Sequence, residues 1–212
     1  MDAETSWRVI EQDRLSLAAL LENLTDDEWN APSLCDGWRV KDVAAHVALT
    51  PQAPGLLSML VEGVRAGGRF HKTNCDFAIR HAERPGANLV AELREHASSR
   101  RLPKVTNYRN IVVDVLVHGQ DIAIPLGIPR KMPKDAALAG IERVWTMGWP
   151  FGVKRPLKRF RFTAADVDWA AGNGPEVRGP VSALLLLLTG RPAGLPQLSG
   201  PGVEELSDLV RR

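Results

Sequence analysis

Residues 107–127, NYRNIVVDVLVHGQDIAIPLG, constrain the fold more than any other stretch of this sequence. They are long enough for about five helical turns at roughly 3.6 residues per turn. Apolar side chains cover most of the circumference of that helix: Ile111, Val112, Val113, Val115, Leu116, Val117 and Ile122. A helix that is apolar nearly all round is usually buried. The sequence therefore predicts a central helix, around which neighbouring segments pack.

One polar stripe interrupts this apolar surface. At about 100° per residue, five polar residues fall within a sector of about 80°: Asn107, Asn110, Asp114, His118 and Asp121. Asp114 and His118 are four residues apart, so their side chains can meet on one face. A buried carboxylate and imidazole are costly unless they are paired, hydrogen-bonded or bound to a metal. From this helix alone, a structural pair and a functional site are equally good interpretations.

The segments before the central helix predict further helices. Apolar residues recur at helical spacing in residues 4–24, 40–50 and 88–101, and residues 52–69 can continue the second of these helices. Residues 25–37 are predicted to form a loop because they contain several helix breakers, and residues 71–79 are ambiguous. Four helical segments joined by connections of moderate length suit a four-helix bundle, which we assign to residues 1–129.

The pattern changes after Pro129. Residues 134–149 and 181–189 predict helices, and a last helix is expected over residues 203–212. KRFRFT, residues 158–163, alternates polar and apolar residues as a strand does, and a second short strand is expected around Val177. The fold class is therefore α+β, with the helical bundle followed by a small C-terminal domain over residues 130–212.

Composition excludes several classes of function. The chain has 212 residues, 44% of them hydrophobic and 25% charged, as is ordinary for a soluble globular protein. Its formal net charge is +2 without a long basic tract, so we expect no nucleic acid partner. The longest apolar run, residues 181–188, is far shorter than the roughly 20 residues of a membrane span, and the acidic start does not resemble a signal peptide. We expect a cytoplasmic monomer or homodimer that does not bind membranes.

Metal chemistry is the function that the polar stripe suits best. Metal sites in helical bundles use inward side chains from facing helices, and zinc-type catalytic sites often use two His and one carboxylate. Asp114 and His118 would supply two ligands from one helix. His46 is the only other histidine inside a clearly predicted helix with apolar surroundings, although it is not on the most apolar stripe. Spacing therefore selects His46, Asp114 and His118, with Asp121 as a hydrogen-bonding residue behind them. Asp121 is also the alternative to Asp114 as the carboxylate ligand.

Other chemistries find less support. The sequence has no G-x-S-x-G, and GNGPEVRG lacks the strand-to-helix context of a dinucleotide-binding loop. Cys35 is interpreted as small packing material rather than as a reactive thiol. The two cysteines, Cys35 and Cys75, do not suggest a disulfide framework.

Three stretches resemble a known family. CDGWRVKDVAAHV, residues 35–47, and VDVLVHGQDIAIPLG, residues 113–127, resemble the N-terminal domain of the mycothiol-dependent maleylpyruvate isomerase family, which belongs to the DinB-like metal-binding bundles. FTAADVDWAAGNGPEVRGPVSALLLLLTGRP, residues 162–192, is similar to that family's second domain, a small sterol-carrier-like α/β domain. These stretches occur in the family's order, and the resemblance extends over nearly the whole chain.

The resemblance implies a DinB-like bundle whose metal is held at the positions of His46, Asp114 and His118. The family usually has Glu where this chain has Asp114, so the carboxylate ligand here is one methylene shorter. The resemblance also implies mycothiol, a low-molecular-weight thiol, as cosubstrate. A coordinating cation deprotonates a thiol whose pKa is about 8.5, and the thiolate then attacks an electrophilic small-molecule substrate.

The function that this resemblance implies is that of a mycothiol-using cis-trans isomerase or S-transferase. The thiolate leaves again after bond rotation in an isomerase and stays attached in a transferase. Two imidazoles and one carboxylate suit Zn²⁺ as the divalent metal, although nickel, iron and copper accept the same ligands. Two alternatives remain: a noncatalytic member that binds a small molecule or a protein, and a metal-dependent hydrolase that activates water.

Overall fold

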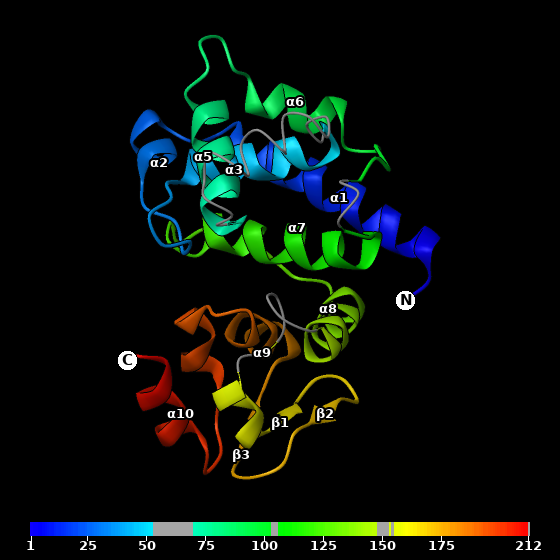
Figure 1. Cartoon of the computed structure of the whole chain (residues 1–212), viewed down its shortest axis with the longest axis vertical. Coiled ribbons are helices and arrows are strands. Elements are labelled where there is room, and N and C mark those ends of the chain that lie inside the picture. Colours follow the sequence, from blue (N-terminus) through cyan, green and yellow to red (C-terminus); the bar gives the residue numbers. More distant parts are fainter. Residues whose placement is uncertain (53–69, 103–105, 148–152, 154, 212) are drawn as a thin grey trace. The chain divides into compact units, whose positions relative to one another are not determined.

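The computed structural model describes residues 1–52, 70–102, 106–147, 153 and 155–211 (Figure 1). The chain divides into two compact units, residues 2–130 and residues 131–212. The predicted α+β class is confirmed, because helices predominate and a three-stranded sheet lies in the second unit. The helix expected over residues 52–69 lies outside the described residues. Within the described part of the chain, no helix is long and apolar enough to span a membrane.

The N-terminal unit is helical. Its described elements are α1 (Ala3–Leu21), α2 (Asp26–Asn30), α3 (Val40–Leu49), the 3-10 turn η1 (Thr50–Gln52), α5 (Phe70–Ala82), α6 (Leu89–Glu95) and α7 (Tyr108–Ala123). α7 packs against α1 and α3, and α3 also packs against α5 and α6 (Figure 1). Val115 and Ile122 of α7 are fully buried. α7 is thus the central helix that its apolar circumference predicts.

Two local differences from the sequence expectations have physical causes. The stretch predicted as a loop at residues 25–37 starts with the short helix α2, which is held by a capping box. In it, the Glu28 carboxylate accepts from the backbone N–H of Thr25 at 2.8 Å, and Thr25 Oγ1 accepts from the N–H of Glu28 at 3.3 Å. The ambiguous residues 71–79 lie in α5.

α6 ends at Glu95 rather than at residue 101. The carbonyl groups that follow it do not continue the helix but accept hydrogen bonds from the fully buried Arg14 of α1. Arg14 Nη1 donates to the carbonyl oxygens of three residues, at 3.3, 3.2 and 3.0 Å: His96, Ala97 and Ser99. A helix C-terminus leaves carbonyls without partners, and here a cation from a neighbouring helix satisfies them.

The C-terminal unit combines α8 (Lys134–Thr146) and α9 (Val181–Leu188) with a sheet of strand order β2-β1-β3. β1 (Arg161–Ala164) pairs antiparallel with β2 (Ala170–Ala171) and parallel with β3 (Glu176–Gly179), and Phe162 lies opposite Val177. The remaining elements are η2 (Arg155–Arg159), η3 (Pro192–Gln197) and α10 (Val203–Val210). α9 packs on α8, β1 and β3, so this unit has an apolar core of its own.

Candidate metal centre

The start of α3 is fixed by a carboxylate from its own first turn. Arg39 occupies the N-cap position, where a residue with a short hydroxyl, amide or carboxylate side chain is usual. Asp42 replaces that cap, because its Oδ2 accepts from the backbone N–H of Arg39 at 2.9 Å and from the Arg39 Nε at 2.9 Å. A negative charge in the first turn also suits the helix dipole. α3 therefore begins at Val40 and presents His46 one and a half turns later.

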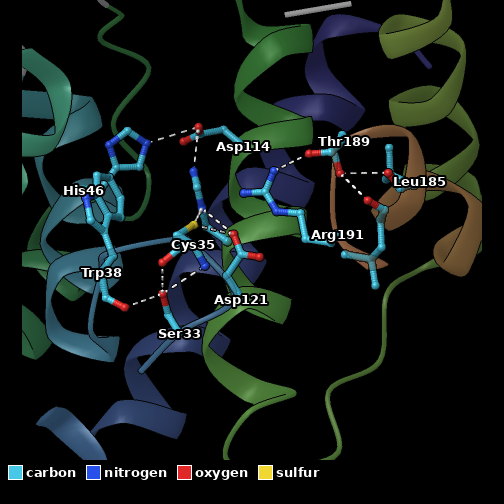
Figure 2. Close-up of polar contacts among 11 residues, drawn as sticks. Ser33, Cys35, Trp38, His46, Asp114, Asp121, Leu185, Thr189 and Arg191 are labelled. Carbon is cyan, nitrogen blue, oxygen red and sulfur yellow. Dashed lines mark hydrogen bonds and ion pairs between the residues drawn. The ribbon is translucent and has the colours of Figure 1, made fainter. Parts of the chain in front are cut away.

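His46 of α3 and Asp114 of α7 point toward one another (Figure 2), and His118 of α7 completes the group. Asp114 Oδ1 lies 3.2 Å from His46 Nε2 and 3.5 Å from His118 Nε2. Two donor atoms at about 2.0–2.1 Å from one tetrahedral ion lie roughly 3.3 Å apart. The spacing of these three side chains therefore fits one metal ion, and the shorter Asp side chain reaches far enough to take part.

The second oxygen of Asp114 has no hydrogen-bond partner within the described part of the chain. Asp114 Oδ2 is buried, and no described residue hydrogen-bonds to it. Buried carboxylate oxygens normally accept at least one hydrogen bond. A cation bound beside Asp114 would interact favourably with this unpaired oxygen and so remove the cost of leaving it unpaired. Burial by itself would raise the pKa of the Asp114 carboxyl, but the charges of His46 and His118 outweigh burial and hold that pKa well below its usual range.

His118 is held from both sides of its ring. Its Nδ1 lies 2.8 Å from Oδ2 of Asp121, whose side chain is fully buried. An ionised carboxylate only accepts hydrogen bonds, so Nδ1 carries the proton. Burial lowers the pKa of His118, but the charge of Asp114 and the hydrogen bonds that His118 shares with Asp114, Asp121 and Cys35 outweigh burial and raise that pKa well above its usual value. His118 therefore lies between two carboxylates, those of Asp114 and Asp121, and both favour its protonated form.

A loop before α3 completes this side of the centre. Cys35 Sγ donates to Asp121 Oδ2 at 3.0 Å and lies 3.7 Å from His118 Nδ1 (Figure 2). The Trp38 ring stacks on the His118 ring, with centroids 6.3 Å apart, and its centroid lies 5.5 Å from that of the His46 ring. Trp38 therefore limits the rotation of both imidazoles, and the loop contributes two side chains to the centre.

The structure brings together the four residues selected from the sequence: His46, Asp114, His118 and Asp121. Their role as ligands stays a prediction. The other two residues of the polar stripe serve the helix start instead, because Asn107 caps α7 by accepting from the N–H groups of Arg109 and Asn110 at 3.1 and 3.3 Å, and the Asn110 side chain donates to Thr106 at 3.1 Å.

The sequence interpretation missed Cys35 as a member of the centre. It lies 83 residues from His118 and 86 from Asp121 along the chain, so no spacing rule connects them. The available signal was its place in the same short stretch as His46, CDGWRVKDVAAH. Cys35 precedes His46 by only 11 residues. The loop that carries Cys35 folds back over α7, where the thiol contacts Asp121 and His118.

Comparisons with known proteins were made for the whole chain. Residues 11–103 match the family model of the mycothiol maleylpyruvate isomerase N-terminal domain, a segment that contains His46 but ends before Asp114 and His118. A crystal structure of the mycothiol-dependent maleylpyruvate isomerase is similar in fold, with a TM-score of 0.64, 14% sequence identity, and coverage of 95% of this chain and 93% of that chain. A mutant of that enzyme with a histidine replaced by alanine gives a TM-score of 0.63 at the same identity and coverage. No curated protein matches.

Proposed function

We propose that the protein is a metal-dependent enzyme that uses mycothiol on an electrophilic small molecule, and the match of residues 11–103 to the family model of the mycothiol maleylpyruvate isomerase N-terminal domain supports this proposal. The observation that carries this proposal is the arrangement of Asp114. Its Oδ1 lies at ligand spacing from the Nε2 atoms of His46 and His118, and its buried Oδ2 has no partner among the described residues. Isomerisation and S-transfer are the two outcomes of thiolate attack.

His46, Asp114 and His118 would hold the metal, and Zn²⁺ is the first candidate because it accepts imidazole and carboxylate ligands in tetrahedral geometry. When bound, the cation supplies the charge that keeps a thiol, whose ordinary pKa is about 8.5, in the thiolate form at neutral pH. Three protein ligands leave one position open. The donor set of this site thus fits the thiol chemistry that the family name implies.

The remaining residues of the centre orient these ligands. Asp121 keeps the proton of His118 on Nδ1, which leaves the Nε2 lone pair for a cation. Trp38 packs against both imidazoles and is almost completely buried, so it keeps water away from one side of the centre. These residues bind, orient and exclude water, and no further proton donor is required for attack by a thiolate.

Metal analysis tests the proposal. Protein purified without an affinity tag, or exposed afterwards to excess zinc, is expected to hold about one ion per chain, as a three-ligand site does. His118→Ala and Asp114→Ala should lose that ion, while His96→Ala, a half-buried histidine outside the cluster, should keep it. Absence of metal from the wild-type protein under both conditions would leave His46, Asp114 and His118 as a structural cluster and favour a noncatalytic binding protein.

Thiol dependence separates the enzyme classes. The metal-loaded protein is expected to consume activated electrophiles, such as cis enol-acids and epoxides, only when mycothiol is present. A conjugate that carries the thiol identifies a transferase, and a trans product with the thiol recovered identifies an isomerase. Turnover of esters or amides by the metal-loaded protein without any thiol would instead favour the hydrolase.

A further inference from the structure

We propose that Cys35 is a positioning residue that acts through Asp121 on His118 and so sets how well His118 binds the metal. The inference rests on the proposed metal centre. It assigns a function to the Cys35 side chain, which takes no part in the proposed reaction of mycothiol. Cys35 reaches His118 in two ways: through Asp121 Oδ2, to which its thiol donates at 3.0 Å, and by the weaker direct approach of Sγ to His118 Nδ1 at 3.7 Å.

Asp121 Oδ2 is the acceptor that Cys35 and His118 share. It accepts from the Cys35 thiol at 3.0 Å and from His118 Nδ1 at 2.8 Å (Figure 2). The terminal torsion of an Asp side chain is broad, so each donor to the carboxylate narrows the range of its plane. Two donors that approach the same oxygen from different elements restrict that plane more than one does, and the orientation of the carboxylate in turn restricts the ring of His118.

The thiol is itself held by the loop at residues 33–38. Ser33 Oγ accepts from the backbone N–H of Cys35 at 3.1 Å, and the Cys35 carbonyl accepts from the N–H of Trp38 at 3.0 Å. Leu34 N–H donates to the carbonyl oxygen of Asp121 at 3.0 Å. The loop is therefore tied to α7 by both main chain and side chain at Asp121. Because the loop runs directly into α3, it also connects the two helices that carry the proposed ligands.

The distances distinguish this role from a second metal site. Cys35, His118 and Asp121 are all possible ligand types, but sulfur and oxygen ligands of one tetrahedral ion would lie roughly 3.6 Å apart and nitrogen and oxygen ligands roughly 3.3 Å. The observed 3.0 and 2.8 Å are shorter and are hydrogen-bond distances. The group around Asp121 is therefore a chain of hydrogen bonds, whereas the group around Asp114 has ligand spacing.

Two substitutions of Cys35 separate the effect of its hydrogen bond to Asp121 from the effect of its side-chain volume. Cys35→Val fills a similar space without a donor, and Cys35→Ser restores a donor. Zinc affinity is measured by competition with a chromophoric chelator. Loss of an outer partner of a ligating His typically weakens metal binding 10- to 100-fold, which we expect for Asp121→Asn. Cys35 is one hydrogen bond further from the metal than Asp121, so we expect a smaller effect. Cys35→Val should weaken zinc binding about 3- to 10-fold, and the zinc affinity of Cys35→Ser should stay within about 2-fold of that of the wild type.

A readout on His118 itself keeps the test independent of overall stability. In the metal-free protein, the Nδ1 proton of His118 should give a strongly deshielded resonance, because it is hydrogen-bonded to a carboxylate. Cys35→Val should shift or broaden this resonance and Cys35→Ser should largely restore it. Leu17→Ala, a core substitution in α1, serves as the matched control: it lowers stability while leaving the resonance and the zinc affinity unchanged.

Three outcomes would overturn the inference. Cys35→Val could equal wild type in both affinity and resonance, which would make Cys35 packing material. Cys35→Val and Cys35→Ser could weaken binding equally, which would assign the effect to side-chain shape. Cys35→Val could abolish binding together with a sulfur-to-metal charge-transfer band in the Co²⁺ protein, which would make the sulfur a ligand. If the wild-type protein binds no metal, the proposed function fails, and the His118 resonance alone decides whether Cys35 positions that ring.

Discussion

Asp114 and His118 face each other in a buried place, and each shifts the pKa of the other. The pKa of His118 is raised in the folded protein, so the folded state holds the His118 proton more tightly than the unfolded chain does. This contribution to stability is complete below the unfolded pKa of about 6.5 and is lost as the pH rises through the raised folded pKa. Asp114 behaves oppositely, because its lowered pKa contributes stability that is lost in acid.

The metal-free protein is therefore expected to lose stability on the alkaline side. Its free energy of unfolding, measured by urea denaturation in the presence of a chelator, should fall as the pH rises from about 6 to about 9. His118→Gln removes the titrating group, so its stability should depend much less on pH over the same range. Parallel pH dependence of the two proteins would show that some other group is responsible.

Gly37 gives a second prediction at the scale of one residue. Its φ is +73°, in the left-handed region, and a Cβ added there would meet nothing within 4 Å. Gly37→Ala should therefore cost backbone strain of about 1–2 kcal/mol without a steric clash. Because Gly37 lies between Cys35 and Trp38, the substitution should also weaken zinc binding. Both effects are measurable, by urea denaturation and by chelator competition.

Gly86 is a matched control for Gly37. It has the same φ of +73°, it also has open space around an added Cβ, and it lies in the turn between α5 and α6. Gly86→Ala should cost a similar amount of stability and leave zinc affinity unchanged. If both substitutions weaken zinc binding alike, the effect comes from general loosening of the bundle, and the loop at residues 33–38 has no special role in the centre.

At the scale of elements, the sequence predicts a helix and its buried face well when the spacing of apolar residues within that helix is enough to determine them. α7 is central because its apolar residues surround it, and the i and i+4 spacing of Asp114 and His118 places both on one face whatever the rest of the chain does. The position of His46 is different. Which face of α3 meets α7 depends on packing between helices, and the most apolar stripe of α3 does not contain His46. The prediction of His46 therefore depended on elimination among the histidines and on the family resemblance, and the apolar pattern of α3 did not support it.

The limits of α6 show the same dependence on tertiary contacts. Helical periodicity continues to residue 101, but the helix ends at Glu95 because Arg14, more than 80 residues away in sequence, takes the carbonyl oxygens that follow. A local pattern contains no information about that donor. The same holds for Cys35 and Asp121, whose hydrogen bond spans 86 residues.

Arg14 provides the prediction at this scale. Arg14→Met keeps much of the buried volume but removes the hydrogen bonds that Arg14 donates to three backbone carbonyls: His96, which keeps the N–H of Ser99 as a donor, Ala97 and Ser99. We expect a loss of about 3 kcal/mol in the free energy of unfolding, since a buried acceptor such as the Ala97 carbonyl is costly when left unpaired. Arg8→Met, the same substitution at an exposed position of α1, should change stability little. Equal effects of the two substitutions would mean that Arg14 stabilises the bundle only through its apolar stem.

At the scale of the whole molecule, all candidate ligands lie in one of the two compact units, residues 2–130. Each unit has its own apolar core, with Leu17 and Val115 in the first and Ile141 and Leu184 in the second. We therefore expect two calorimetric transitions, one for each unit. A metal that binds only the folded first unit stabilises that unit by mass action, by about 2.7 kcal/mol when free zinc is 100 times Kd.

Zinc should consequently raise the temperature of one transition and leave the other in place. Ile141→Ala, which creates a cavity in the C-terminal unit, identifies the transition of that unit by lowering it, since such cavities cost about 2–5 kcal/mol. His118→Ala should abolish the zinc-induced shift of the other transition, because it removes a proposed ligand. A zinc-induced shift of the transition assigned through Ile141 would place the ion outside the cluster of His46, Asp114 and His118, and a shift that survives in His118→Ala would do the same.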